Sequence, residues 1–172
     1  MTEASGSPSG PEPPELSRTA TKVSEELRRL GVASEVREMP ESTRTAEEAA
    51  AAVGCDVAQI VKSLIFRSVT ADEAVLVLVS GADRVDEAVL AGIVGENVER
   101  ASANFVRERT GYAIGGVPPL AHSGPIVTYL DEHLLEQPVV WAAAGTPRAV
   151  FSITPSELVR ITSAVVTAVA AS

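Results

Sequence analysis

The chain has 172 residues, of which 45% are hydrophobic and 22% charged, so it is long enough for one domain with a substantial core. Its net charge of −9 excludes a protein that grips duplex DNA through many phosphate contacts, because that mode of binding needs a large basic surface. The single cysteine, Cys55, excludes an internal disulfide and, with no signal peptide predicted, favours a cytoplasmic protein.

The N-terminal part of the chain predicts a tail followed by a helix. Residues 1–17 hold four prolines and almost nothing apolar, which is typical of a disordered segment. We therefore expect one folded domain over residues 18–172. Apolar residues at helical spacing predict an amphipathic helix over residues 16–30, and alternation over residues 34–39 favours a short strand.

A second helix and a hairpin follow. Thr45 and Glu48 have the spacing of a capping box, which predicts a helix that begins after Thr45 and ends at Gly54. Residues 60–67 and 74–80 read as two strands joined by a polar turn. The second strand is almost wholly apolar, so we expect both of its faces to be covered.

The C-terminal half alternates helices and strands. Helices are predicted over residues 83–94 and 103–110, the latter capped by Ser102, and strands over residues 126–130, 139–143 and 148–153. A second capping box at Thr154 predicts a final helix with Leu158, Ile161, Val165 and Val169 facing the core. This order indicates an α+β domain with a mixed sheet surrounded by helices. The apolar run over residues 161–171 is too short to span a membrane.

Several common catalytic motifs are absent from the sequence. It has no phosphate-binding glycine loop, no dinucleotide fingerprint, no zinc-protease motif and no serine nucleophile elbow. Asp131, His122 and His133 could ligate a metal, but two histidines and one aspartate occur together by chance often. We predict no metal and no cofactor.

Two features suggest a binding pocket. Lys62 is one of only two lysines and lies within an apolar strand, where it could hold a phosphate as a point charge. Equally, a strand lysine can extend harmlessly to an edge. The segment over residues 110–125 holds four glycines and three prolines among apolar residues, so a bulky ligand could approach its backbone. A structural crossover is the alternative. Gly145 is a third candidate for close backbone approach, although a plain turn glycine is the more ordinary interpretation.

These residues together resemble the YbaK/EbsC family, which is related to the editing domain inserted in bacterial prolyl-tRNA synthetases. The resemblance runs over residues 27–168. Its motifs occur in the family's order: T-x-E-x-A-A-x-x-x-G from Thr45, QIVKSLIF with Lys62, TGYAIGGVPPL, YLD ending at Asp131, and AAAG ending at Gly145 followed by ITPSEL. The resemblance implies a curved, barrel-like mixed sheet flanked by helices.

The resemblance further implies trans-editing, in which the ester that joins a wrong amino acid to tRNA is hydrolysed, with Ala- or Cys-tRNA-Pro as the typical substrate. It places Lys62 near the phosphate of the terminal adenosine and Gly115, Gly116 and Asp131 at the reacting ester. Substrate-binding positions are then Thr45, Val117, Pro118, Pro119, His122 and Gly145. Prolyl-tRNA synthetase is an expected partner, and a monomer or weak homodimer the expected state.

The sequence departs from the family pattern in the glycine-proline loop. Pro118 stands where serine is common, and Ala121 and His122 stand where a glycine and lysines often follow. A proline there lacks both a hydroxyl and a backbone donor. The alternative function is therefore a tRNA- or nucleotide-binding module that has kept the pocket and lost catalysis. A hydrolase of small activated esters, independent of tRNA, is a third reading.

Overall fold

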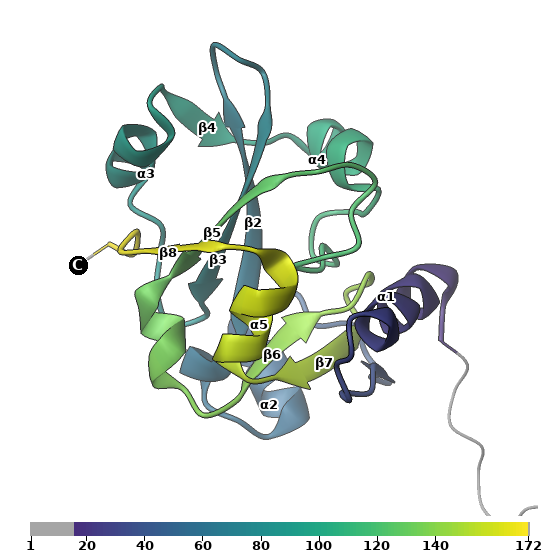
Figure 1. Ribbon diagram of the computed structural model, residues 1–172. Helices are drawn as coiled ribbons and strands as arrows, with labels where there is room; N and C mark the ends of the chain where they lie inside the picture. Colours follow the sequence, from purple (N-terminus) through teal and green to yellow (C-terminus); the bar gives the residue numbers. More distant parts are fainter. Residues whose placement is uncertain (1–15, 172) are drawn as a thin grey trace, which may run out of the picture.

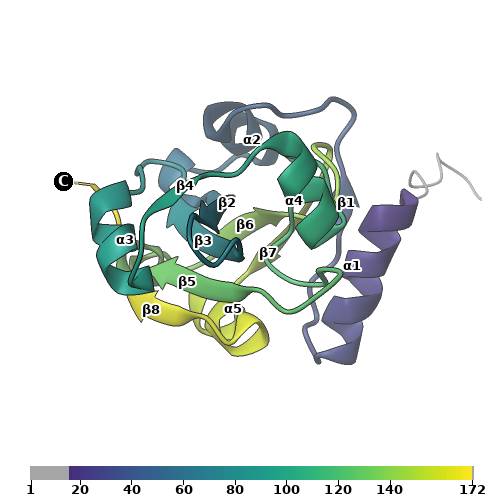
Figure 2. The same ribbon diagram turned by 90° about the horizontal axis from the view of Figure 1, so that it is seen from above.

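The computed structural model describes residues 16–171 and shows an α+β domain in which helices surround two β-sheets (Figures 1 and 2). None of the described helices is long and apolar enough to cross a membrane. The described elements are α1 Arg18–Arg29, β1 Arg37–Glu38, α2 Ala46–Val53, η1 Val57–Gln59, β2 Val61–Ser68, β3 Ala74–Ser80, α3 Glu87–Val94, β4 Val98–Arg100, α4 Ala103–Thr110, β5 Val127–Asp131, η2 Glu132–Glu136, β6 Val140–Ala143, β7 Ala149–Ile153, α5 Pro155–Thr162 and β8 Val165–Thr167.

The larger sheet is mixed and has the strand order β4-β2-β3-β5-β8. Strands β2 and β3 form the predicted antiparallel hairpin, with Val61 opposite Ser80, whereas β3, β5 and β8 run parallel. The smaller antiparallel sheet has the order β1-β7-β6. An isolated bridge between Ile60 and Trp141 joins the two sheets. The barrel-like arrangement therefore stays open along the rest of that seam.

The core lies on both faces of the larger sheet. In β3, Leu76 and Leu78 belong to the main cluster, whereas Val75 and Val77 belong to a smaller cluster that includes Leu90 of α3. Because side chains alternate along a strand, an apolar β3 needs cover on both sides. Helix α3 supplies that cover on one face, which confirms the expectation from the sequence.

The predicted tail and the first helix meet at Ser17. Its hydroxyl accepts a hydrogen bond from the Ala20 amide at 3.2 Å and so caps α1, which ends close to the predicted residue. Leu16 packs against the main core. Both residues therefore belong to the folded domain, which starts before residue 18. The rest of the predicted tail, residues 1–15, lies outside the described residues.

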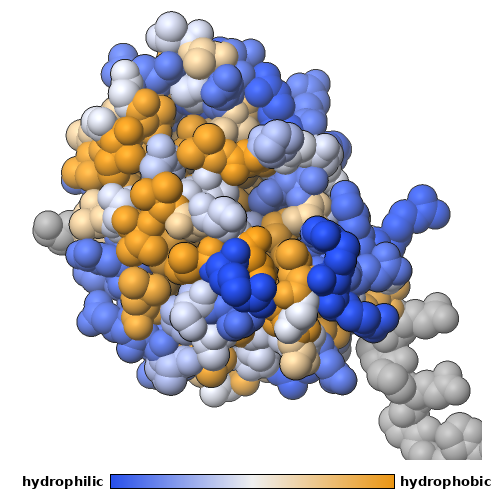
Figure 3. Space-filling view, in the orientation of Figure 1, coloured by the Kyte–Doolittle hydropathy of each residue, from blue (hydrophilic) through white to orange (hydrophobic). Residues whose placement is uncertain are grey.

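The final helix is shorter than predicted. Helix α5 ends at Thr162, where Ser163 adopts φ 54°, and residues 165–167 then form β8 beside β5. The prediction that Val165 faces the core from a helix was wrong, because Val165 is 55% exposed at the sheet edge. Figure 3 shows apolar side chains on the face that carries this edge. Consecutive β-branched residues favour the strand there.

The helix predicted from residue 83 also begins later. Asp86 caps α3 in an extended conformation, so the helix starts at Glu87. Val85 pairs with Ala170, and the Asp86 amide donates to the Val169 carbonyl at 2.8 Å. The C-terminal segment therefore takes the backbone hydrogen bonds that a longer helix would have used.

Candidate functional site

A cavity of about 290 Å³ opens between the two sheets. Strand β4 pairs only with Phe66–Ser68 of β2, so the β2 edge from Val61 to Ile65 has no strand beside it in the larger sheet. The cavity lies against this edge, and α2, the glycine-proline loop, β6 and β7 close its other sides. Its walls are mostly apolar. Its polar lining side chains come from Thr43, Arg44, Thr45, Lys62, Ser63, Arg100, Trp141 and Thr146.

Lys62 borders this cavity from β2, on the strand that the sequence predicted. Its ammonium group donates a hydrogen bond to the Asp83 carbonyl, in the loop that follows β3. Burial lowers the pKa of Lys62, and the nearby charge of Arg100 lowers it further, while Asp83 and Glu47 oppose the shift. An ammonium has three donors, so one is used and the others can reach a ligand.

The glycine-proline loop meets the cavity through three residues. Ile114 lines it, as do Gly115, with φ 94°, and Val117. Gly116 lies between them but packs elsewhere, because a Cβ on Gly116 would lie 2.7 Å from the Thr146 Cα. Its amide donates to the Ala113 carbonyl at 3.0 Å. Among the described residues, the amides of Gly115 and Val117 make no such bond.

The rest of the loop is held internally and does not line the cavity. Pro118 and Pro119 are buried. The His122 ring nitrogen Nε2 lies 2.7 Å from the Pro118 carbonyl oxygen, and burial lowers the pKa of His122. The Tyr112 hydroxyl donates to the Ala121 carbonyl at 2.7 Å. The two departures from the family pattern therefore lie in a part of the loop that is satisfied by its own contacts.

Thr45 and Gly145 have different surroundings. Thr45 caps α2, with its hydroxyl accepting from the Glu48 amide at 3.1 Å, and it also lines the cavity. Gly145 has φ 101°, and a Cβ there would lie 2.9 Å from the backbone of Thr19 in α1. Gly145 is therefore a close-packing position against α1, outside the cavity lining.

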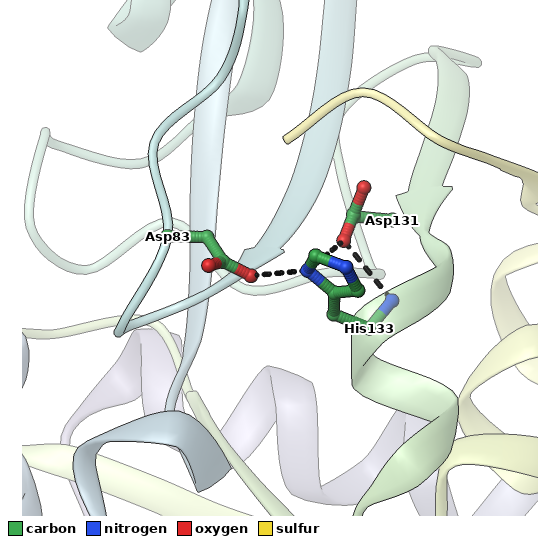
Figure 4. Close-up of side chains that lie close together, drawn as sticks. All are labelled: Asp83, Asp131 and His133. Atoms are coloured by element: carbon green, nitrogen blue, oxygen red, sulfur yellow. Dashed lines mark hydrogen bonds and ion pairs between the residues drawn. The ribbon is translucent and has the colours of Figure 1, made fainter. Parts of the chain in front are cut away.

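Asp131 also lies outside the cavity lining. Its carboxylate is 1% exposed and accepts the amides of Val169 and Ala170 at 2.9 Å each and that of His133 at 3.0 Å. Figure 4 shows His133 between Asp131 and Asp83, with its Nδ1 2.8 Å from an Asp83 oxygen. Both Asp131 oxygens accept backbone amides, so this residue fastens the C-terminal segment to the end of β5.

Of the metal ligands considered from the sequence, only Asp131 and His133 lie together, in this cluster. Ligand atoms of Asp83, Asp131 and His133 lie within 4.8 Å of one another, whereas His122 is not part of the group. Asp83 raises the pKa of His133, chiefly through the hydrogen bond to its carboxylate. The cluster is explained by these contacts, and we assign no metal to it.

Sequence reasoning missed the two arginines of the cavity, Arg44 and Arg100. Arg100 ends β4, a strand that was not predicted, and its guanidinium lies 5.9 Å from the centre of the Phe66 ring. Arg44 directly precedes the α2 cap. Neither arginine lies close to Lys62 in the sequence. Arg100 reaches the site only because β4 pairs with β2 in the folded chain.

Comparison with known proteins identifies the family. The model of the aminoacyl-tRNA editing domain matches residues 40–161. The chain belongs to this editing-domain family. Over 127 residues it is 35% identical to the uncharacterized protein YwhH of Bacillus subtilis (strain 168), covering 73% of this chain and 79% of that protein.

Two solved structures are similar over nearly the whole editing domain. One, a candidate trans-editing enzyme for prolyl tRNA synthetase, is 48% identical with a TM-score of 0.87, covering 92% of this chain and 100% of that one. The other, the hypothetical protein APE2540, is 37% identical with a TM-score of 0.82, covering 87% and 99%. Family and structure confirm the resemblance to YbaK/EbsC proteins and support an editing function that acts on aminoacyl-tRNA.

Proposed function

We propose that this editing domain hydrolyses the ester of mischarged tRNA-Pro, with alanine or cysteine as the amino acid. The observation that carries the proposal is the cavity of about 290 Å³ between Lys62 and the Gly115–Val117 backbone. Apolar walls discriminate by size, since one extra methylene on the ligand costs on the order of 1–3 kcal/mol in such a pocket. A small amino acid therefore suits it better than a large one.

The reaction needs a positioned water and a stabilised oxyanion. Water attacks the ester carbonyl carbon, the C–O bond to the terminal ribose breaks, and the ribose oxygen leaves with a proton. An aminoacyl ester is already activated, so placement and charge stabilisation supply most of the acceleration. Gly115 and Val117 line the cavity, and their amides are the candidate oxyanion donors, in place of the Gly116 amide, which donates to the Ala113 carbonyl.

Three cations suit the phosphates of the tRNA end. Lys62, Arg44 and Arg100 border one cavity in a chain whose net charge is −9. An acidic protein binds nucleic acid weakly in general, so a local cationic rim would confine the contact to the acceptor end. Arginine can contact a phosphate through two parallel hydrogen bonds, whereas lysine acts as a point charge.

One observation favours the alternative, a binding module without catalysis. Among the described residues, no aspartate, glutamate, histidine or cysteine lines the cavity. Of the side chains that commonly serve as a general base, only Lys62 lines the cavity within the part of the chain that the structure describes. In this reading, the same cavity binds the acceptor end and the chain serves as an adaptor.

A deacylation panel separates the two functions. Purified protein is incubated with Ala-, Cys-, Ser- and Pro-charged tRNA-Pro, and the remaining ester is measured over time. Release of alanine or cysteine, with prolyl-tRNA-Pro spared, supports the editing enzyme. Tight binding of these tRNAs without ester loss supports the adaptor. Hydrolysis of aminoacyl esters that lack tRNA, at equal efficiency, would contradict both.

A further inference from the structure

Ser63 is a polar residue on the cavity wall whose hydroxyl has no partner. It lies in β2 between Lys62 and Leu64, and it shares a strand face with Val61 and Ile65 of the main core. The residue borders the cavity, but its hydroxyl oxygen is shielded from solvent and makes no hydrogen bond within the described residues. Only Ser34, near the end of α1, shares this condition among those residues.

A buried hydroxyl without a partner is destabilising. Nearly all buried polar side-chain atoms have a hydrogen-bond partner. Without one, the group loses its hydrogen bonds to water on burial and gains nothing in their place. Alanine or valine at position 63 would occupy the same strand face as Val61 and Ile65 without the cost of burying an unpartnered hydroxyl. The adjoining cavity offers an explanation for the Ser63 hydroxyl, because a ligand bound there can supply the missing partner.

The surroundings favour a neutral ligand group. Val61 and Ile65 flank Ser63 on its own face, so a charged ammonium there would lose its hydration without a counter-charge. A hydroxyl or thiol has a smaller desolvation penalty and can both donate and accept. Rotation about the Cα–Cβ bond moves the Ser63 hydroxyl oxygen between staggered positions. A change of rotamer is therefore enough to turn this oxygen toward a ligand in the cavity.

We propose that Ser63 is a specificity-determining residue, whose hydroxyl pairs with a hydroxyl or thiol on the side chain of the esterified amino acid. This inference rests on the proposed editing of mischarged tRNA-Pro and revises the order of its amino acids: the cysteine ester, together with the serine ester, is preferred over the alanine ester. A site that hydrogen-bonds a substrate hydroxyl discriminates strongly against the analogue without it.

The first test is stability without substrate. Ser63→Ala removes an unpartnered hydroxyl, so its melting temperature rises by about 2–4 °C relative to wild type. Ser34→Ala is the matched control, since it removes the other unpartnered hydroxyl away from the cavity, and its melting temperature rises similarly. A lower melting temperature for Ser63→Ala would show a structural partner and overturn the proposal.

The second test is selectivity. kcat/KM is measured for Ser-, Cys- and Ala-tRNA-Pro with wild type, Ser63→Ala and Ser34→Ala. In Ser63→Ala, the ratio of kcat/KM for Ser-tRNA-Pro to kcat/KM for Ala-tRNA-Pro falls roughly 10–100-fold. The corresponding ratio of Cys-tRNA-Pro to Ala-tRNA-Pro falls less, because a thiol is a weak donor. Ser34→Ala keeps the wild-type ratios.

The outcomes separate this inference from the function on which it rests. If wild type hydrolyses these esters and Ser63→Ala leaves the ratios unchanged, the role of Ser63 is overturned and the proposed function stands. Equal loss on all three esters indicates a structural role and also overturns it. If wild type hydrolyses none of them, the proposed function fails, and the inference fails with it.

Discussion

At the scale of single residues, two neighbours in the glycine-proline loop have different tasks. Gly115 lines the cavity with φ 94°, a conformation that side chains disfavour. Gly116 instead packs on the backbone of Thr146, so the space beside its Cα is filled by protein. The resemblance implied that Gly116 lies at the reacting ester; in the structure its neighbours Gly115 and Val117 line the cavity, and Gly116 sets the distance between the loop and residue 146.

Gly116→Ala is expected to lower stability and deacylation together. A Cβ 2.7 Å from the Thr146 Cα forces the loop away from the turn between β6 and β7 and displaces the Gly115 and Val117 amides. Overpacking of this kind costs about 1–3 kcal/mol, or several degrees in melting temperature. Gly124→Ala is the control in the same loop, because no atom lies within 4 Å of its added Cβ. Thermal melts and single-turnover deacylation on the same preparations check this. Full activity in a destabilised Gly116→Ala would contradict the link between packing and site.

Lys62→Ala is expected to lower deacylation by at least about tenfold while the melting temperature stays within about 2 °C of wild type. Removing the ammonium would take away the proposed charge-assisted contact to phosphate, and such a contact is stronger than a neutral hydrogen bond. Lys22→Ala is the control, since Lys22 lies over the Tyr112 ring, 5.5 Å from its centre, and not at the cavity. Rates are measured with Ala- and Cys-tRNA-Pro. A folded Lys62→Ala with the full wild-type rate would remove Lys62 from the site.

At the scale of elements, the ends of helices carry the differences between prediction and structure. The caps at Thr45, Ser102 and Thr154 lie where the sequence patterns predicted them. The end of α5 does not, because pairing of β8 with β5 competes with continuation of the helix. A local cap is decided by a few neighbouring residues, whereas the end of α5 depends on a strand that lies next to it only in the folded chain.

The start of α1 gives an element-scale prediction. Deleting residues 1–17 is expected to lower the melting temperature by about 2–4 °C relative to deleting residues 1–15. The longer deletion removes the Ser17 cap, typically about 1 kcal/mol, and the contact of Leu16 with the core. Ser17→Ala in the full chain isolates the cap and should account for most of the loss. Identical melting of the two truncated proteins would show that α1 does not need its N-terminal contacts.

At the scale of the whole molecule, a side-chain cluster at the end of β5 ties the C-terminal segment to the sheet, in addition to the backbone pairing of that segment. Asp131 holds the Val169 and Ala170 amides, and His133 joins it to Asp83. The Asp83 carbonyl in turn accepts from Lys62. Contacts therefore run from the cavity rim to the C-terminal end of the described chain, through residues that are distant in sequence.

The pH dependence of stability is expected to report this cluster. The Asp83 hydrogen bond raises the pKa of His133 above its ordinary value of 6.5, so its stabilising contribution is present at low pH and is lost as pH rises through the raised pKa. His133→Asn should therefore lower the melting temperature more at pH 5.5 than at pH 8.5. Burial lowers the pKa of His122, so its pH dependence has the opposite sign: the stability that neutral His122 contributes is lost as pH falls. His122→Asn should therefore lower the melting temperature less at pH 5.5 than at pH 8.5. An equal effect of His133→Asn at both pH values would contradict the pairing.

The sequence by itself determined most elements, the β2–β3 hairpin and the presence of Lys62 in a covered strand. These features depend on spacing within a few residues, which capping boxes and alternation record directly. The motifs that carry the family resemblance also lie within short stretches. They predicted the α+β fold and the editing family, both of which the structure and the comparisons confirm.

Only the tertiary structure decided which candidate residues meet at one cavity. Lys62, Thr45, Gly115 and Val117 line it, whereas Asp131 and Gly145 hold other parts of the chain together. The physical reason is that contacts such as Gly116 with Thr146 join residues far apart in sequence. Strand register and the opening between the two sheets set those contacts, and no short pattern encodes either.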